Sequence, residues 1–391
     1  MSSWTLCALF CKQYAPASNR TMNVALHADR LFRSAPTGIG VYTDRLLQYA
    51  PQVAPDDSFF AVALPEQGDT RPLGVPARTL PVPRRVGMVT QTAFGWPRIE
   101  SAVGEADLVH TLTTTPVATR LPRVQTIHDL TPQLFPDQYS KLHRRLSSKS
   151  LRRAVKGGAH LIAISEHTAG DLMRLTGVGS DRITVVLLGY DAPAEAPPKA
   201  EQRAAVRQSF GLTGPFVMFT GALTRRKNLV FLIDAFARLR RRQPEVQLVL
   251  AGRPGLGAEE IDAAIRHHGL DQAVLRPGYV SDRDLTTLLF EASAFAFPSH
   301  YEGFGIPPLD AMAHGTPVVA CPGGAVQEVV GDAALVVSPE NPSQFADALA
   351  SVLTDAAEAD RLRAAGYERI RTFSWRRMAR ETVDVYHHVA R

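Results

Sequence analysis

The chain has 391 residues, of which 45% are hydrophobic and 21% are charged. One hydrophobic core stops growing at roughly 250–300 residues, so we expect two domains. The hydrophobic fraction excludes a disordered chain, and no apolar run reaches the roughly 18 residues that would predict a membrane-spanning helix. The three cysteines, Cys7, Cys11 and Cys321, have neither the number of a disulfide framework nor the spacing of a zinc site, which favours a reducing cytoplasm.

The formal net charge of +5 is unevenly distributed. Residues 1–190 contain 21 Lys and Arg against 14 Asp and Glu, whereas the rest of the chain contains 22 against 24. Seven basic residues and no acidic one fall within Tyr139–Lys156, where leucines recur near helical spacing. This segment predicts either a basic helix that lies on anionic lipid or a solvated helix face. Basic residues elsewhere are dispersed and form no aromatic-rich module, which argues against nucleic-acid binding.

Residues 1–21 differ from the rest of the chain, and their short apolar patch lacks the basic start of a secretory signal. We expect a disordered leader, with Met22 as the natural start. From there, short apolar runs alternate with helical patterns, which predicts parallel sheets covered on both faces. The predicted strands of the first half are Val24–His27, Phe59–Leu64, Leu108–Thr111, Val124–His128, Leu161–Ser165 and Ile183–Leu187. Those of the second half are Phe216–Thr220, Gln247–Ala251, Val274–Arg276, Ala294–Phe297, Pro317–Ala320 and Leu335–Val337.

A proline-rich break, Tyr190–Ala200, separates the two series and is typical of an exposed linker. We therefore predict an N-terminal Rossmann-like domain over 22–192, a linker over 193–204 and a C-terminal Rossmann-like domain over 205–375. Ligands of such folds bind at the carboxyl ends of the strands, so we expect the site in a cleft between the domains.

The segment after the predicted strand Ala294–Phe297 carries the strongest chemical signal. Glu302 precedes Gly303, Phe304 and Gly305, and a helix is expected to open at Pro307. Glycines at such a turn let backbone N–H groups approach a ligand, and with the helix dipole they form a phosphate site. An ordinary tight turn is the alternative.

A second segment, Gly221–Asn228, follows the first strand of the second domain. Its Arg226 and Lys227 suit a diphosphate, since Arg donates two parallel hydrogen bonds and Lys acts as a point charge. A solvated basic turn is the alternative. We expect this segment and Glu302 to lie close together, at adjacent positions on the carboxyl edge of one sheet.

Together these segments resemble the second domain of the family-4 glycosyltransferases, an α/β family of GT-B architecture with two doubly wound Rossmann-like domains facing a central cleft. The family's hallmark is two Glu separated by seven residues around a Gly-Phe-Gly turn. Here Glu302, seven residues and Asp310 occupy those positions. Arg226 and Lys227 match the family's diphosphate-binding pair, and Gly278-Tyr279-Val280 resembles its nucleobase segment.

The resemblance continues in order along the chain. It includes, in the first domain, the glycine loop Thr37–Tyr42, the His-Asp step Thr126–Leu130 and the Ser-Glu step Ala163–Thr168, and in the second domain the late motif Gly323–Ala334. The family's last helix crosses back onto the first domain, and we expect this of residues 376–391.

The resemblance implies transfer of a hexose, with mannose as the first choice, from a nucleotide diphosphate sugar. The acceptor would be a hydroxyl of a saccharide or of a polyprenyl-diphosphate-linked acceptor. The anomeric configuration of the sugar would be retained. The resemblance is closest to bacterial mannosyltransferases of surface-polysaccharide and lipopolysaccharide assembly. The expected catalytic residues are His128, Glu302, Arg226 and Lys227. The expected donor-binding residues are Gly38, Gly40, Gly221, Tyr279, Val280, Gly303, Phe304, Gly305 and Asp310.

The expected donor is GDP-mannose, with a UDP-sugar as the alternative, and no metal is expected. Asp282-Arg283-Asp284 resembles a metal motif but more simply begins a helix. Asp310 is one methylene shorter than Glu, so its grip on the ribose is expected to be weaker or to pass through water. The pairs His267-His268 and His387-His388 are expected at the surface.

Two other functions remain open from the sequence, a GT-B sugar-nucleotide epimerase and a catalytically weak GT-B scaffold subunit. The expected location is the cytoplasm, at the inner face of the plasma membrane if Tyr139–Lys156 contacts lipid.

Overall fold

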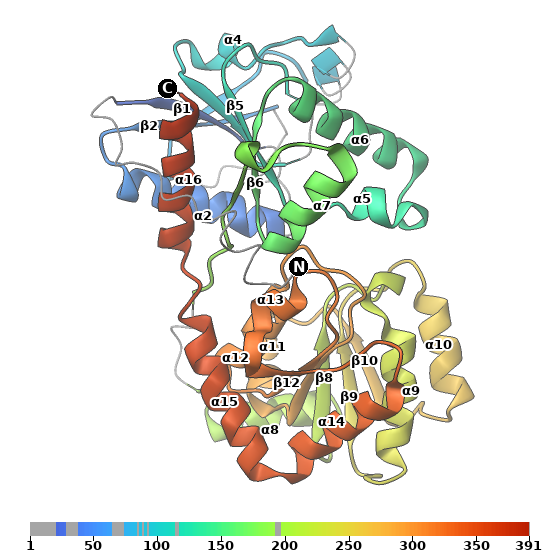
Figure 1. Cartoon of the computed structure of the whole chain (residues 1–391). Helices are drawn as coiled ribbons and strands as arrows, with labels where there is room; N and C mark the ends of the chain where they lie inside the picture. The colour runs from blue at the N-terminus through green and yellow to red at the C-terminus, as the bar shows by residue number, and fades with distance from the viewer. Residues whose placement is uncertain are drawn as a thin grey trace. The chain divides into compact units, whose positions relative to one another are not determined.

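The computed structural model describes residues 21–28, 38–64, 74–83, 86–87, 90–91, 94–113, 117–191 and 197–390. Residues 1–20 of the expected leader, Thr37 of the glycine loop and residues 192–196 at the predicted linker lie outside these ranges. The chain forms two compact units, each described by itself: unit 1 comprises Met1–Gly189 with Phe373–Arg391, and unit 2 comprises Tyr190–Thr372 (Figure 1).

Unit 1 is built on a parallel sheet of order β3-β2-β1-β4-β5-β6-β7. Its strands are β1 (Asn23–His27), β2 (Ser58–Ala63), β3 (Ala77–Thr79), β4 (Leu108–Thr111), β5 (Arg123–Ile127), β6 (His160–Ala163) and β7 (Ile183–Val185). Its helices are α2 (Gly38–Val53), α4 (Glu100–Val103), α5 (Thr131–Leu134), α6 (Lys141–Lys156), α7 (Glu166–Thr176), α16 (Trp375–Val389) and the 3₁₀ turns η1 (Pro136–Gln138) and η2 (Ser180–Arg182).

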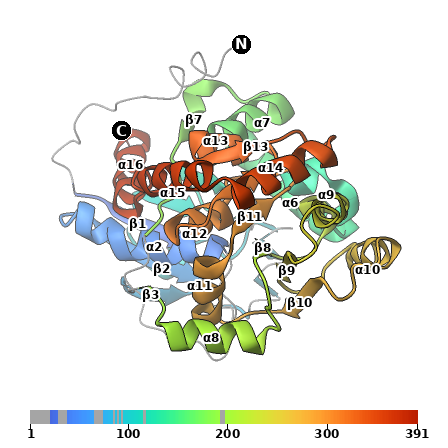
Figure 2. The same ribbon diagram turned by 90° about the horizontal axis from the view of Figure 1, so that it is seen from below.

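Unit 2 has a parallel sheet of order β10-β9-β8-β11-β12-β13. Its strands are β8 (Phe216–Thr220), β9 (Gln247–Ala251), β10 (Val274–Gly278), β11 (Ala294–Phe297), β12 (Val318–Ala320) and β13 (Ala334–Val336). Its helices are α8 (Ala200–Ser209), α9 (Leu229–Arg240), α10 (Ala258–His267), α11 (Asp282–Glu291), α12 (Ile306–Ala313), α13 (Val326–Val330), α14 (Pro342–Thr354), α15 (Ala356–Ile370) and the 3₁₀ turns η3 (Arg225–Lys227) and η4 (Gly331–Ala333). Helices α9 and α14 pack side by side (Figure 2). Both predicted doubly wound sheets are therefore confirmed.

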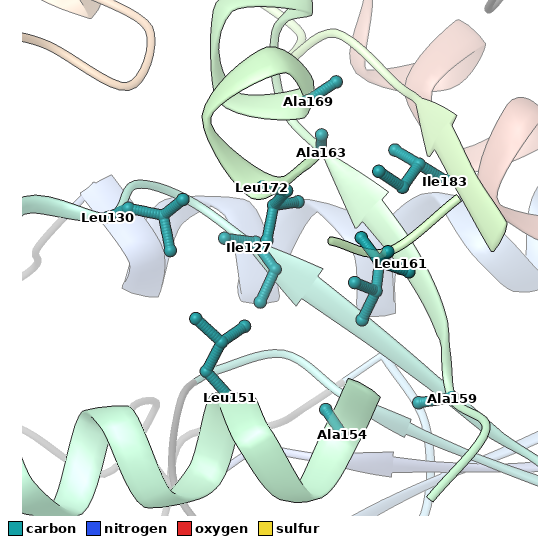
Figure 3. Close-up of a cluster of buried hydrophobic side chains, with 11 residues drawn as sticks. Ile127, Leu130, Leu151, Ala154, Ala159, Leu161, Ala163, Ala169, Leu172 and Ile183 are labelled. Atoms are coloured by element: carbon teal, nitrogen blue, oxygen red, sulfur yellow. The ribbon is translucent and has the colours of Figure 1, made fainter. Parts of the chain in front are cut away.

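Buried apolar side chains fix helices to each sheet. In unit 1, Ile127 on β5 lies between Leu151 of α6 and Leu172 of α7, with Leu161 of β6 beside it (Figure 3). All four side chains are at most 5% exposed, and full burial of such a side chain contributes roughly 1.5–3 kcal/mol. This packing sets the position of the residues that follow β5.

Local signals begin and end the helices. Ser140 caps α6 by accepting a hydrogen bond from the His143 N–H, and Ser165 caps α7 by accepting from the Thr168 N–H. Gly177 ends α7 at φ 69°, a left-handed conformation that favours glycine. Ser281 caps α11 in the same way, so Asp282 and Asp284 lie in a first helical turn, as predicted.

The last helix belongs to unit 1, where α16 packs along α2 (Figure 1). Its apolar face buries Trp375, Met378, Val383 and Tyr386. The prediction that His387 lies at the surface is wrong. Its imidazole is buried and its Nε2 lies 2.9 Å from Oδ2 of Asp57, just before β2.

Three further predictions need correction. The edge strand β3 is not among the predicted strands, because all of its residues are exposed and show no apolar pattern. Gly38 and Gly40 lie in the first turn of α2 rather than in a loop. Helix α8 begins at Ala200, inside the predicted linker. Among the helices that the structure describes, none combines the length and apolar character needed to cross a bilayer.

Candidate active site

The strand order of unit 2 reverses between β8 and β11, which are neighbours in the sheet. Loops leaving two such strands diverge to opposite sides, and the crevice at their carboxyl ends is where doubly wound sheets bind ligands. The loops here are Gly221–Asn228, after β8, and Ser299–Gly305, after β11. The two segments with the strongest chemical signal in the sequence are therefore brought together, as predicted.

Glu302 is held between the two predicted cations. Its Oε1 lies 2.6 Å from Lys227 Nζ, and its Oε2 lies 2.8 Å from Arg226 Nη1. Lys227 is 9% exposed and Glu302 12%. Burial by itself raises the pKa of Glu302, but the charges and hydrogen bonds of Lys227 and Arg226 outweigh it, so the pKa lies below its ordinary value. The carboxyl group is thus ionised, and the three side chains carry one net positive charge.

Further contacts hold this cluster in place. Arg226 also donates to the Tyr301 carbonyl, and Lys227 Nζ lies 5.2 Å from the centroid of the Phe297 ring. Asn228 follows at φ 55° and leads directly into α9. The cations are therefore presented by a fixed turn rather than by flexible surface side chains.

The loop that carries Glu302 is hydrogen-bonded to the glycine motif Gly323–Ala334. Glu302 N–H donates to the Gly323 carbonyl, and the Glu302 carbonyl accepts from the Ala325 N–H. A Cβ on Gly323 would lie 2.0 Å from the Ser299 carbonyl oxygen, and one on Gly324 would lie 2.3 Å from that of Glu302. Only glycine permits this approach, which explains the motif physically. Gly305 then caps α12 at φ 110°.

Two buried polar atoms at this edge have no hydrogen-bond partner among the described residues. They are Nδ2 of Asn228, beside the cations, and Oγ of Ser299, at the exit from β11. Buried polar groups are usually hydrogen-bonded, so a group left unsatisfied at a crevice fits a site whose ligand supplies the partner. The sequence pattern did not single out either residue.

Asp310 lies in α12, and the Tyr190 hydroxyl donates a hydrogen bond to its carboxylate. Burial raises the pKa of Asp310 from 3.8 to about 6, and the bond from Tyr190 opposes this only in part. In the sequence, Tyr190 is only the first residue of the proline-rich break Tyr190–Ala200. Its contact with Asp310 could not be read from the sequence.

The raised pKa of Asp310 predicts a pH-dependent stability. Since folded Asp310 holds its proton more tightly than unfolded Asp310, its contribution to stability falls as pH rises from about 4 to about 6 and stays low above that. Asp310→Asn is therefore expected to raise the free energy of unfolding by about 1–2 kcal/mol at pH 7 and to have little effect at pH 4. Urea unfolding at both pH values measures this, with exposed Asp347→Asn as control. The same gain at both pH values would contradict it.

The predicted nucleobase segment lies at the same sheet edge, two strands from β8. Tyr279 is 63% exposed, Val280 is buried, and the Arg253 guanidinium lies 5.2 Å from the centroid of the Tyr279 ring. A cavity of about 560 Å³ adjoins it, lined in part by Leu223, Pro254 and Gly278. Strands are spaced by about 4.8 Å, so the backbones of β10 and β8 are roughly 10 Å apart.

His128 follows β5 in unit 1. Its Nε2 lies 3.1 Å from the Leu112 carbonyl oxygen, which only accepts, so Nε2 carries a proton. The Tyr42 ring meets the imidazole edge to face, with centroids 4.9 Å apart and planes at 82°. His128, Gly38 and Gly40 thus belong to unit 1, whereas the other predicted site residues belong to unit 2. Within the described residues, no three His, Cys, Asp or Glu side chains form a metal-binding group.

Comparisons with known proteins decide the family. Residues 36–192 match the model described as Glycosyltransferase Family 4, and residues 202–369 match that described as Glycosyl transferases group 1. The chain is 30% identical over 273 residues to the O-antigen chain mannosyltransferase B of Escherichia coli, covering 67% of this chain and 69% of that protein. The chain belongs to glycosyltransferase family 4.

Other comparisons extend this result. The glycosyltransferase is 35% identical over 237 residues to a D-inositol 3-phosphate glycosyltransferase of Xylanimonas cellulosilytica, covering 58% of this chain and only 56% of that relative. The solved structure of Anabaena HepE in complex with UDP and glucose matches with a TM-score of 0.70 and 20% identity, over 94% of this chain and 99% of that one. The latter likeness confirms the predicted GT-B fold.

Proposed function

We propose that this glycosyltransferase moves a hexose, with mannose as the first candidate, from a nucleotide diphosphate sugar to a hydroxyl of a saccharide or lipid-linked saccharide in bacterial polysaccharide assembly. The Arg226–Glu302–Lys227 cluster at the switch point of unit 2 carries the proposal. Its net positive charge, on a rigid turn at the carboxyl edge of the sheet, suits a diphosphate. The mannosyltransferase named among the relatives supports the choice of sugar.

The reaction builds negative charge on the departing diphosphate. In the proposal, Lys227 and Arg226 stabilise that charge as fixed cations, assisted by backbone N–H groups of Gly303–Gly305 at the start of α12. Asn228 Nδ2 would donate to a phosphate oxygen, which supplies the partner that it lacks among the described residues. Glu302 would accept hydrogen bonds from hydroxyls of the donor sugar. No metal is assigned a step.

The rest of the donor would extend along the same edge. The exposed Tyr279 ring offers a stacking face for the base, and Asp310 would accept from the ribose hydroxyls. His128, which belongs to unit 1, would contact the sugar. GDP-mannose is the proposed donor and a UDP-sugar the alternative, in keeping with the UDP bound by HepE.

Retention of configuration places the acceptor on the face that the diphosphate leaves. A diphosphate oxygen then takes the acceptor proton, while the bond from the anomeric carbon to the acceptor oxygen forms and that to the phosphate oxygen breaks. NMR of the product tests this proposal. We expect the α-anomer from GDP-α-mannose and a mixture of saccharide acceptors. A β-product would overturn retention, and conversion of the donor to another sugar nucleotide without acceptor would identify an epimerase.

Helix α6 offers a surface to an anionic membrane. Lys141, Arg145, Lys149, Arg152 and Lys156 are all exposed and fall within one 80° sector of the helix at about 100° per residue, opposite the buried Ser147, Leu151 and Ala154. Leu142, at the edge of this sector, is 67% exposed. We propose that this basic face holds the enzyme at the lipid where a polyprenyl-diphosphate acceptor lies.

Neutralising two of these charges is expected to weaken membrane binding. Each basic residue near an anionic surface contributes about 1 kcal/mol, so Arg145→Ala with Lys149→Ala should lower partitioning onto phosphatidylserine vesicles about 30-fold at low salt. Vesicle sedimentation measures this. The exposed pair Arg238→Ala with Arg241→Ala on the surface of unit 2 is the matched control. Equal losses from both pairs, or no binding by the unaltered enzyme, would eliminate the membrane proposal.

A further inference from the structure

A chain of buried hydrogen bonds runs through unit 1 and is not part of the proposed donor site. His110 on β4 contacts two hydroxyls: Nδ1 lies 2.6 Å from Tyr386 Oη, on α16, and Nε2 lies 2.8 Å from Thr126 Oγ1, on β5. Thr126 Oγ1 in turn lies 2.9 Å from Tyr42 Oη, on α2. All four side chains are at most 1% exposed. The final helix is therefore joined to α2 through the two central strands.

One assignment of donors and acceptors satisfies every hydrogen-bonding group in this network. Burial, with a smaller contribution from His128, lowers the pKa of His110 from 6.5 to about 3, so its ring is neutral and carries one N–H. Thr382 on α16 is hydrogen-bonded to Tyr42 and donates its own proton to the Met378 carbonyl. The Tyr42 hydroxyl must then donate to Thr382 and accept from Thr126.

The remaining protons follow from that assignment. Since Thr126 donates to Tyr42, it accepts from His110 Nε2–H, and His110 Nδ1 accepts from the Tyr386 hydroxyl. This series of hydrogen bonds begins at the Tyr386 hydroxyl and ends at the Met378 carbonyl, and both residues are on α16. A fully satisfied network of this kind is rigid, because each hydroxyl has one direction that leaves no buried group unpaired.

One member of this network, Tyr42, contacts His128, and two others lie close to it along the sheet. Thr126 and His128 are two residues apart along β5 and its exit, so their side chains leave the same side of the backbone. The Tyr42 ring packs edge to face against the imidazole. On β4, His110 is two residues from Leu112, whose carbonyl binds His128 Nε2. The Tyr42 ring and the Leu112 carbonyl therefore both contact the imidazole, and the network fixes the elements that present them.

We propose that Tyr42 is a positioning residue that holds the His128 imidazole in the orientation in which its Nε2–H meets the Leu112 carbonyl, and that α16 anchors Tyr42 through Tyr386, His110 and Thr126. The role of His128 in sugar transfer rests on the proposed function, whereas its orientation does not. The last helix of the chain, far from His128 in sequence, becomes part of the support of a candidate catalytic residue.

The experiment combines two substitutions that remove one oxygen each. Tyr42→Phe keeps the ring beside His128 but breaks the bonds to Thr126 and Thr382. Tyr386→Phe removes the hydrogen bond between Tyr386 and His110, at the other end of the network, and leaves the Tyr42 ring beside His128 unchanged. Tyr49→Phe is the matched control, since it makes the same change on α2 at a partly exposed position outside the network. Long-range ¹H–¹⁵N NMR of the full-length enzyme, with the His128 signals assigned from His128→Gln, reads the tautomer directly.

We expect the unaltered enzyme and Tyr49→Phe to show one His128 tautomer, protonated at Nε2. Tyr42→Phe should give a mixture of tautomers and lower kcat roughly tenfold with little change in the donor KM, and Tyr386→Phe should shift the same signals in the same direction by less. Unchanged His128 signals in Tyr42→Phe, even with lower thermal stability, would reduce the network to a structural role and overturn the proposal. Full activity of His128→Gln beside a changed tautomer in Tyr42→Phe would support the positioning and contradict only the assigned role of His128.

Discussion

Replacing Lys227 with alanine is expected to lower the rate of sugar transfer by two to three orders of magnitude. Lys227 is the more buried of the two cations that flank Glu302, and its Nζ lies 2.6 Å from the carboxylate. Without it, the cluster has no net positive charge, and the departing diphosphate loses a preorganised partner. Loss of one such partner costs about 2.7–4 kcal/mol of transition-state stabilisation. Steady-state kinetics with a nucleotide sugar and acceptor measure the effect.

The same 3₁₀ turn supplies the control. Arg225 lies in η3 with Lys227 but pairs with Glu260, at the surface, rather than with Glu302. Arg225→Ala is expected to leave kcat and KM within about twofold, since exposed ion pairs contribute little. Equal losses from Arg225→Ala and Lys227→Ala would mean that the turn, not the charge at Lys227, matters. Full activity of Lys227→Ala would remove it from the mechanism.

Replacing Glu302 with glutamine is expected to destabilise unit 2 and to make its stability depend on nucleotide. Removing one partner of a buried ion pair costs about 3–5 kcal/mol, because charges are left uncompensated. Here the two cations flanking position 302 would lose the carboxylate charge that lies between them. A bound diphosphate returns negative charge to them, so GDP should raise the melting temperature of Glu302→Gln more than that of the unaltered enzyme.

Thermal unfolding with and without GDP tests this. Glu260→Gln, on the exposed partner of Arg225, is the matched control and should unfold like the unaltered enzyme in both conditions. A smaller GDP-dependent gain in Glu302→Gln than in the unaltered enzyme would show that the cations do not meet the diphosphate. Unchanged stability of Glu302→Gln without nucleotide would contradict the buried pairing itself.

The two sheets could be predicted because their strands are buried on both faces. Phe216–Thr220 and Gln247–Ala251 have no exposed residue, and such runs stand out between helical patterns. The edge strand β3 could not, since Ala77, Arg78 and Thr79 are all exposed and gain strand structure only by pairing with β2. The loop predicted at Gly38 and Gly40 is the start of a helix, and the buried Tyr42, Leu46 and Leu47 continue helical spacing from these glycines.

The sequence predicted which residues belong to the candidate site, but not which of them pair with one another. Adjacent strand ends placed Arg226 and Glu302 at one sheet edge, but their ion pair joins residues far apart in the sequence and depends on side-chain geometry. The bond between His387 and Asp57 is hidden for the same reason, with 330 residues between them. Asp310 was expected to be a weaker ribose ligand, and its contact with Tyr190 gives that carboxylate a second constraint.

A thermal-shift screen of nucleotide sugars against the unaltered enzyme and Lys227→Ala tests whether unit 2 binds a nucleotide diphosphate sugar at the Arg226–Glu302–Lys227 cluster. Binding to the folded state raises the melting temperature by mass action. We expect GDP-mannose, or failing that a UDP-sugar, to raise the melting temperature of the unaltered enzyme, and Lys227→Ala to lose most of that shift. No shift with any nucleotide sugar, or an equal shift in Lys227→Ala, would contradict binding at this cluster.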